Sequence, residues 1–395
     1  MEKPFEPRSE FLIFGSPLIM EEDIQEVVAT LRSGWIGTGP KVARFEAAFR
    51  ELIGCRHAIA VNSCTAALSL ALDLAEVGSG DEVITTPMTF AATANVIGHH
   101  GAQPVFADVD RASGNILPKE IERHITPKTK VLMPVHLAGR PCQMDRIMEI
   151  ARAHNLLVIE DAAHAIEAYY QGAKVGNIGD FAAFSFYPTK SLTTAEGGML
   201  TTNRDEWAEK ARLLHLHGIS ADAWKRYSDA GYTHYETVLP GYKYNLSDLQ
   251  AALALHQMER LEQNLHRREA IWQLYDRGLA GLNGLILPPP VESDELGKTV
   301  HARHLYTVMV DPAEAGFTRD DVMRRLKDVN IGTGVHYVAL HMQHFYRETY
   351  GYQPDDFPNA RWISDRTLSL PLTAKMTLTD AEDVIAAIRW IWDRS

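Results

Sequence analysis

The segment Phe184-Ser185-Phe186-Tyr187-Pro188-Thr189-Lys190 places a serine and a lysine directly after an apolar run that begins at residue 181. An apolar run that leads into polar residues and a proline is typical of a buried strand followed by a loop. Upstream, the apolar residues 156–159 lead in the same way into Glu160-Asp161-Ala162-Ala163-His164. The two stretches predict two buried strands that each end in potentially reactive side chains.

Short apolar runs alternate with helical patterns between about residues 57 and 203. We expect strands over residues 57–61, 81–86, 103–109, 129–135, 156–161, 181–186 and 198–203, and helices over residues 65–77, 91–98, 119–125, 144–154 and 204–216. This alternation indicates an α/β fold with a mostly parallel, seven-stranded sheet. Because ligands bind beyond the carboxyl ends of such strands, residues 62–65, Asp161 and residues 185–190 are expected to converge.

The length of 395 residues favours two domains. We expect a large domain over residues 15–255 and a smaller C-terminal α/β domain over residues 256–395, on which residues 1–40 pack. Residues 246–279 predict one long bridging helix. A strand over residues 303–310, a helix over residues 318–329 and a terminal helix from residue 379 are expected to follow it.

The formal charge of −12 argues against nucleic acid or an anionic membrane as a partner. No run approaches the roughly 18 apolar residues that span a bilayer, and we expect no signal peptide. Three cysteines in widely separated positions argue against a disulfide framework and favour a cytoplasmic protein. None of the histidines forms a known metal signature, so no metal is expected.

Lys190 and Asp161 are the residues that point to a specific chemistry. Pyridoxal phosphate (PLP) needs a lysine that binds its aldehyde and an acid that pairs with its pyridine nitrogen. A lysine in an apolar loop has a lowered pKa and is a competent nucleophile and base. Taken alone, a lysine is usually solvated, and Asp161 could equally be a structural carboxylate or a helix cap.

A phosphate site is predicted where the helix from Thr65 follows a strand. The backbone N–H groups of Cys64, Thr65 and Ala66 should lack partners there, and a helix N-terminus with hydroxyl groups nearby binds phosphate well. Ser185 is a second candidate. Each of these residues could also serve only as a helix cap or strand end.

Several stretches together resemble one family, the DegT/StrS sugar-nucleotide aminotransferases. They are residues 34–40, 62–68, 86–95, 160–165, 184–190 and 241–246, which follow the family's order over nearly the whole chain. Residues 241–246 and 332–337, together with His341, are most similar to members that aminate a UDP-linked 4-keto-pentose.

The resemblance implies a fold-type I PLP-dependent transferase that forms a homodimer with active sites shared between subunits. It implies that Lys190 holds the cofactor, Asp161 pairs with the ring nitrogen and His164 lies near the ring hydroxyl. Phe90 would stack on the ring. Cys64, Thr65 and Ser185 would bind the phosphate, with Lys243 reaching it from the neighbouring subunit where many members have asparagine. The residues expected to contact substrates are Trp35, Thr38, His336, Tyr337 and His341.

The implied reaction moves an amino group from glutamate, which leaves as 2-oxoglutarate, to a keto carbon of a nucleotide sugar, with UDP and carbon 4 favoured. The product would serve surface polysaccharide, lipid A or glycoconjugate biosynthesis. A 3-amino sugar of dTDP-deoxysugar biosynthesis and a non-catalytic PLP-binding regulator remain alternatives. Lys190 argues against the related dehydratases, which have histidine there. A dinucleotide-dependent oxidoreductase is disfavoured because residues 62–66 contain no glycine.

Overall fold

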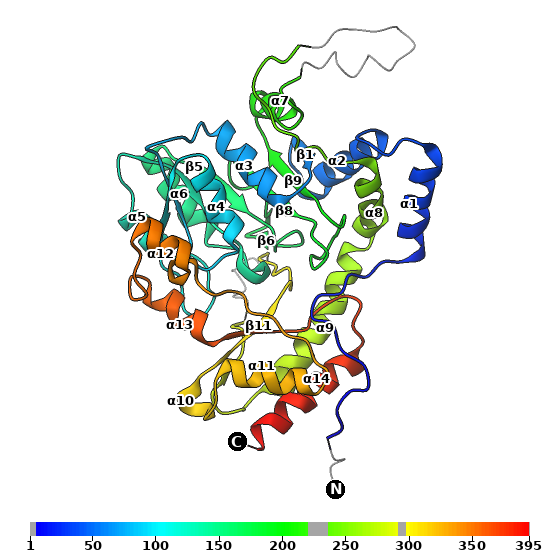
Figure 1. The fold of residues 1–395 in the computed structure, drawn as a ribbon, viewed down its shortest axis with the longest axis vertical. Coiled ribbons are helices and arrows are strands. Elements are labelled where there is room, and N and C mark those ends of the chain that lie inside the picture. Colours follow the sequence, from blue (N-terminus) through cyan, green and yellow to red (C-terminus); the bar gives the residue numbers. More distant parts are fainter. Residues whose placement is uncertain (1–4, 220–235, 291–297, 395) are drawn as a thin grey trace.

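A computed structural model of the chain describes residues 5–219, 236–290 and 298–394 (Figure 1). Its centre is a seven-stranded sheet in the order β1-β9-β8-β5-β4-β2-β3. The strands are β1 (His57–Val61), β2 (Glu82–Thr85), β3 (Gln103–Phe106), β4 (Thr129–Met133), β5 (Leu157–Asp161), β8 (Phe181–Ser185) and β9 (Gly198–Thr202). Only β9 runs antiparallel to its neighbours, so the predicted mostly parallel sheet of seven strands is confirmed.

Helices cover both faces of this sheet. They include α3 (Cys64–Leu74), α4 (Ala91–His99), α5 (Pro118–Arg123), α6 (Met144–His154) and α7 (Asp205–Leu214). Strand β8 shows why both faces are apolar: Phe181 packs into the cluster around α3, while Phe184 packs into a separate cluster with Phe49. A strand buried on both faces carries an apolar side chain at nearly every position, as the sequence of β8 does.

The predicted single helix over residues 246–279 is wrong, because the chain breaks at Arg260. Helix α8 (Asp248–Glu259) begins after the capping residue Ser247 and ends at Arg260, where φ is −104° and ψ is 2°. Helix α9 (Leu261–Leu279) begins at the next residue. The Arg260 guanidinium lies 2.6 Å from the buried carboxylate of Asp23. The break lets α8 pack on the N-terminal helices while α9 packs on the C-terminal helix.

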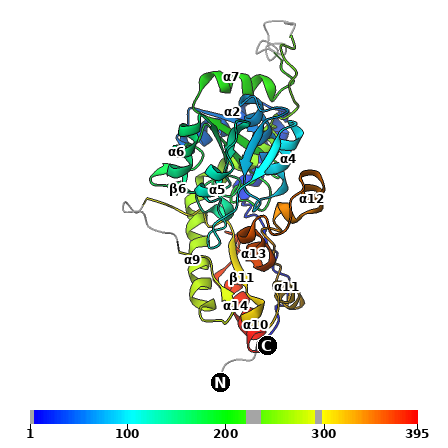
Figure 2. The same cartoon turned by 90° about the vertical axis from the view of Figure 1, so that its left-hand side faces the viewer.

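A smaller α/β unit follows α9, below the large sheet in Figures 1 and 2. Its antiparallel sheet contains β10 (Leu285–Ile286), β11 (Tyr306–Val310) and β12 (Thr367–Leu370). Its helices are α10 (Pro312–Ala315), α11 (Arg319–Asp328), α12 (His344–Tyr350), α13 (Pro358–Arg366) and α14 (Leu378–Trp392). The expected smaller C-terminal α/β domain is therefore present.

The N-terminal region contacts both units. Leu12 bridges to Ile331, and the Phe5 ring lies 4.9 Å from that of Trp390, so the first described residues pack on the C-terminal unit. In contrast, α1 (Glu21–Ser33) and α2 (Pro40–Ile53) pack on α8. We propose residues 15–255 and 256–395 as the two domains. None of the described helices has the length and apolar character needed to cross a membrane.

Candidate active site

Strand pairing brings the predicted residues to the carboxyl ends of the parallel strands, which form one edge of the sheet. Ser185 lies opposite Gly198, which in turn lies opposite Val61, and Asp161 pairs with Ala183 one strand away. Because β9 is antiparallel, its first residue lies at the same edge as the last residues of β1, β5 and β8. The loop with Lys190 and the start of α3 both leave the sheet at this edge.

Lys190 lies half-buried in a tight loop just beyond β8. Its backbone N–H donates to the carbonyl of Tyr187 at 2.9 Å, and the Thr193 hydroxyl anchors the loop on the carbonyl of Phe186. Burial lowers the pKa of Lys190 to about 8, although the charges on Cys64 and Asp161 oppose the shift. The amine is therefore substantially neutral in mildly alkaline solution, as a nucleophile or base must be.

This pKa predicts how the apo-protein reacts with an amine-selective reagent such as trinitrobenzenesulfonate. Only the neutral amine reacts, so labelling of Lys190 should rise with pH and be half-maximal near pH 8, against about 10.4 for an ordinary lysine. Peptide mapping must separate Lys190 from the buried Lys174, whose pKa is also lowered to about 8 by burial. Half-maximal labelling of Lys190 above pH 10 would contradict the prediction.

Asp161 is 4% exposed at the end of β5. The Thr93 hydroxyl donates to its Oδ2 at 2.8 Å, and the Ala163 N–H donates to its Oδ1 at 3.1 Å. Burial raises the pKa of Asp161, while these bonds and the charge of Lys190 oppose the rise. Sequence reasoning missed Thr93, although its i, i+4 spacing from Thr89, which bonds to it at 2.8 Å, was a usable signal.

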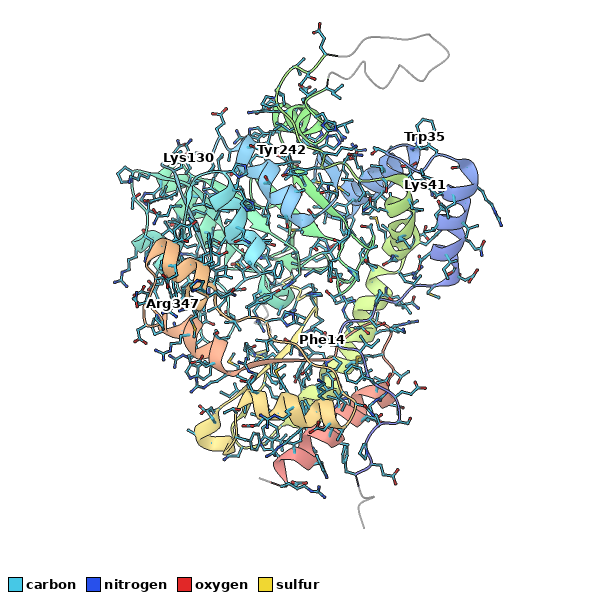
Figure 3. All side chains as sticks on the ribbon, viewed as in Figure 1. Phe14, Trp35, Lys41, Lys130, Tyr242 and Arg347 are labelled. Carbon is cyan, nitrogen blue, oxygen red and sulfur yellow. The ribbon has the colours of Figure 1, made fainter. Side chains whose placement is uncertain are left out.

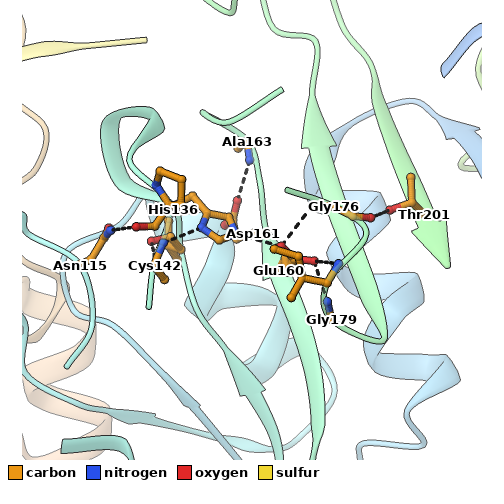
Figure 4. A network of polar contacts seen from close by, with 12 residues as sticks. Asn115, His136, Cys142, Glu160, Asp161, Ala163, Gly176, Gly179 and Thr201 are labelled. Carbon is orange, nitrogen blue, oxygen red and sulfur yellow. Dashed lines mark hydrogen bonds and ion pairs between the residues drawn. The ribbon is translucent and has the colours of Figure 1, made fainter. Parts of the chain in front are cut away.

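Behind Asp161 lies a buried polar network (Figure 4). The Glu160 carboxylate accepts bonds from the N–H groups of Gly176, Ile178 and Gly179 and lies 3.1 Å from His136 Nε2. The backbone N–H of His136 donates to the backbone carbonyl of Asp161. Because each polar group is satisfied, the network fixes the end of β5 rather than costing stability.

The start of α3 forms a second polar feature beside Ser185. The Ser63 hydroxyl accepts from the N–H of Ala66 at 3.1 Å, so the expectation that this N–H is free is wrong. The N–H groups of Cys64 and Thr65 have no acceptor in the described part of the chain. A Cβ on Gly198 would lie 2.6 Å from the N atom of Cys64, so only glycine lets β9 approach this helix end. Two free donors at a helix N-terminus suit an anion such as a phosphate group.

Phe90 and Tyr337 flank the same edge of the sheet. Phe90 immediately precedes α4 and is 64% exposed, which is unusual for a phenylalanine next to buried polar groups. Its ring lies 6.3 Å from that of Tyr337. The Tyr337 hydroxyl in turn lies 3.2 Å from His164 Nε2. No hydrogen bond joins His164 to Asp161 in the described residues.

Hydrogen bonds link Trp35, Thr38 and Lys243 to one another through Asn245. Trp35 lies beside Lys41, at the start of α2 (Figure 3). The Trp35 indole N–H donates to the carbonyl of Thr38 at 3.1 Å. The Thr38 hydroxyl accepts from Asn245 at 2.6 Å, and Asn245 also accepts from Lys243 Nζ at 2.6 Å. The carbonyl of Lys243 also accepts from Asn62 Nδ2 at 3.1 Å, and Asn245 bridges to Val61, so this group lies next to the end of β1.

The two C-terminal histidines differ in position. His336 Nδ1 lies 2.8 Å from the Ser369 hydroxyl, and burial together with the charge of Lys190 lowers the pKa of His336 to about 4. His341 is fully buried, with Nε2 3.3 Å from the carbonyl of Pro354 and its ring against Phe357. A ring without exposed surface cannot contact a substrate in this conformation, so the structure does not place His341 in the site.

The sequence model of the DegT/DnrJ/EryC1/StrS aminotransferase family matches residues 17–389. The chain belongs to this family. Its curated relatives include the spore coat polysaccharide biosynthesis protein SpsC of Bacillus subtilis. The two sequences are 51% identical over 383 residues, and the alignment covers 97% of this chain and 97% of SpsC. The resemblance found in the sequence motifs is thereby confirmed at the level of the family.

Solved structures of similar proteins agree. The putative sugar aminotransferase Spr1654 from Streptococcus pneumoniae in its PMP form has a TM-score of 0.89 and is 34% identical, covering 97% of this chain and 99% of that chain. DesI in the presence of its TDP-sugar product has a TM-score of 0.85 and is 29% identical, covering 99% of this chain and 95% of that chain. The protein is thus a fold-type I, PLP-dependent sugar aminotransferase.

The residues at the sheet edge fit PLP. A buried carboxylate suits the protonated pyridine nitrogen, and a lysine with a lowered pKa suits the aldehyde. The free N–H groups at the start of α3 suit the phosphate. The absence of a side chain at Gly198 leaves the Cys64 N–H uncovered. The exposed face of Phe90 suits an aromatic ring. The site thus offers a suitable partner for each end of the cofactor.

Proposed function

We propose that the enzyme transfers an amino group from glutamate to carbon 4 of a UDP-linked keto sugar, for surface polysaccharide, lipid A or glycoconjugate biosynthesis. The observation that carries the proposal is that Lys190 and Asp161 leave neighbouring strands at one edge of the sheet, close enough for each to affect the other's pKa. A cytoplasmic location is part of the proposal, and three free cysteines support it.

Lys190 would both hold the cofactor and move the proton in the reaction. Bound PLP supplies an aldehyde that captures amines and a ring that delocalises the charge left when a C–H bond breaks. The neutral Lys190 amine would take the proton from the α-carbon of glutamate and return it at the cofactor's reactive carbon. The Asp161 carboxylate, fixed by Thr93 and Ala163, would hold the proton on the ring nitrogen.

The other residues would bind and orient the cofactor. Cys64 and Thr65 would hold the phosphate through their N–H groups and Ser185 through its hydroxyl, while Phe90 would stack on the ring. Lys243 would reach the phosphate of the partner subunit in a homodimer. Its side chain is exposed, with Nζ 2.6 Å from Asn245 Oδ1, so the amine is accessible to a partner subunit, which supports this role.

Trp35, Thr38, His336 and Tyr337 are the proposed contacts to the sugar nucleotide and the amino donor. Trp35 is 53% exposed, and its indole is already held by the carbonyl of Thr38, so the ring offers a fixed apolar face. His336 is neutral near pH 7 because its pKa is lowered to about 4. We leave His341 out of this set because it is fully buried.

One specific observation favours a second candidate substrate. DesI, which shares the fold over nearly the whole chain, was crystallised with a TDP-sugar product, so a dTDP-linked keto sugar aminated at carbon 3 or carbon 4 is the alternative. The residues that line the pocket decide which nucleotide sugar is used. A site that hydrogen-bonds a particular substrate group strongly rejects an analogue that lacks this group.

The test measures formation of 2-oxoglutarate and of amino sugar by mass spectrometry. The purified enzyme is given glutamate with UDP-4-keto, dTDP-4-keto or dTDP-3-keto sugars in turn. We expect the largest kcat/KM with the UDP-4-keto sugar. A larger kcat/KM with a dTDP sugar would contradict the proposal and identify that sugar as the better substrate. A cofactor absorbance that glutamate does not change would instead indicate a non-catalytic regulator.

A further inference from the structure

His164 and Tyr337 form a hydrogen-bonded pair inside the site, although 173 residues separate them. His164 follows β5, whereas Tyr337 comes from the C-terminal unit. Their rings stack at 6.2 Å with an angle of 19°, and the ring of His304 lies 4.5 Å from His164. The His164 ring is thus enclosed by aromatic neighbours and cannot easily turn.

The backbone decides which nitrogen of His164 carries the proton. The Ala138 N–H, which can only donate, points at His164 Nδ1 at 3.2 Å, so Nδ1 is the unprotonated nitrogen. Burial and the positive charge of Lys190 hold the pKa of His164 well below its usual value, which keeps the ring neutral. The single ring proton therefore lies on Nε2 and is donated to the Tyr337 oxygen at 3.2 Å.

The Tyr337 hydroxyl therefore keeps a proton that it does not use within the chain. In the described residues its O–H has no acceptor, because the group next to it, His164 Nε2, is itself the donor. Burial and the Asp161 carboxylate raise the pKa of Tyr337, so the hydroxyl stays protonated. Tyr337 is a fixed donor that is ready for an acceptor oxygen from outside the chain.

The chemistry of PLP supplies one such oxygen. Its ring hydroxyl lies on the edge between the aldehyde carbon and the pyridine nitrogen, the two ends assigned to Lys190 and Asp161. The His164–Tyr337 pair lies near both ends, because Lys190 acts electrostatically on His164 and Asp161 acts on Tyr337. The exposed ring of Phe90, assigned to the cofactor face, is 6.3 Å from Tyr337.

We propose that Tyr337 donates the hydrogen bond to the ring oxygen of PLP and that His164 is a positioning residue behind it. The proposal rests on the placement of the cofactor between Lys190 and Asp161. It changes the expectation that His164 itself faces the ring hydroxyl, because the only proton of His164 is already committed to Tyr337.

The test uses the pH titration of the absorbance of PLP bound to Tyr337→Phe, without sugar or amino donor. A hydrogen bond donated to the ring oxygen stabilises that oxygen in its negatively charged form. It therefore lowers the pKa of the proton that the ring oxygen shares with the Lys190 nitrogen. Removing the donor should therefore move the titration midpoint upward by roughly one pH unit. Tyr346→Phe is the matched control, because the Tyr346 hydroxyl bonds to Asn95 at 2.6 Å, and its midpoint should not move.

His164→Ala and the double variant separate the two possible donors. If Tyr337 is the donor, His164→Ala shifts the midpoint in the same direction and the double variant shifts it no further than Tyr337→Phe. A shift in His164→Ala with an unchanged Tyr337→Phe would show that His164 donates directly and would overturn the proposal. An unchanged midpoint in both variants would overturn it as well.

A second measurement needs no cofactor. The ¹⁵N spectrum of histidine-labelled apo-protein should show His164 protonated on Nε2, and protonation on Nδ1 would overturn the proposal even if a variant fails to bind PLP. Both measurements are independent of the proposed substrates. An incorrect sugar or amino donor would leave them unchanged, so failure of the proposed function is distinguishable.

Discussion

Replacing Lys190 with alanine is expected to lower the rate of transamination by about 10⁴-fold or more, because one residue both carries the cofactor and moves the proton. The fold should survive, since the side chain of Lys190 makes no hydrogen bond in the described residues and the loop is held by Phe186 and Thr193. The measurement is single-turnover formation of 2-oxoglutarate from glutamate, with the melting temperature recorded in parallel.

Two further variants sharpen this prediction. Lys190→Arg keeps a positive charge but cannot lose a proton near neutral pH, so it should be as inactive as the alanine variant. Lys210→Ala removes a lysine that is 42% exposed and 3.9 Å from Glu76, and it should keep full activity. If Lys190→Ala retained more than a tenth of the normal rate, the proton transfer would have to be assigned to another group.

The sequence was sufficient to predict the large sheet, because each of its strands is a short apolar run bounded by polar or small residues. Asp161 and Lys190 could be found for a related reason: a charged residue at the end of a buried strand, or in the apolar loop that follows one, is costly unless it has a role. The N-terminal boundary of α8 was also readable in principle, since Ser247 and Gln250 form a capping box. Local patterns therefore accounted for most of the architecture.

Features that depend on contacts distant in sequence could not be predicted. The break at Arg260 reflects where α8 and α9 pack and the ion pair with Asp23, neither of which alters the helical periodicity. The burial of His341 depends on Phe357 and Pro354, and the meeting of His164 with Tyr337 joins two units of the fold. Periodicity describes one element at a time, so it carries no information about such pairs.

Asp161→Asn is expected to lower turnover by about 10²- to 10³-fold, the usual cost of losing one preorganised electrostatic contact. The asparagine has nearly the same shape. Ala163 can still donate to its carbonyl oxygen, and the Thr93 hydroxyl can rotate to accept from its NH₂ group while donating to Thr89. The loss should therefore appear in the rate and not in the melting temperature. Asp320→Asn, at a carboxylate that is 71% exposed on α11, is the matched control.

The same variant tests whether the acid and the lysine act as one site. The Asp161 carboxylate stabilises the ammonium form of Lys190, so removing its charge should lower the pKa of Lys190 below about 8. In apo-protein carrying Asp161→Asn, half-maximal labelling of Lys190 should therefore move to lower pH, whereas Asp320→Asn should leave it in place. An unchanged midpoint would mean that the two groups do not interact, and the loss of turnover would then need a cause outside the Lys190–Asp161 pair. A downward shift together with lost turnover would connect the buried carboxylate at the end of β5 to the reactivity of the lysine beyond β8.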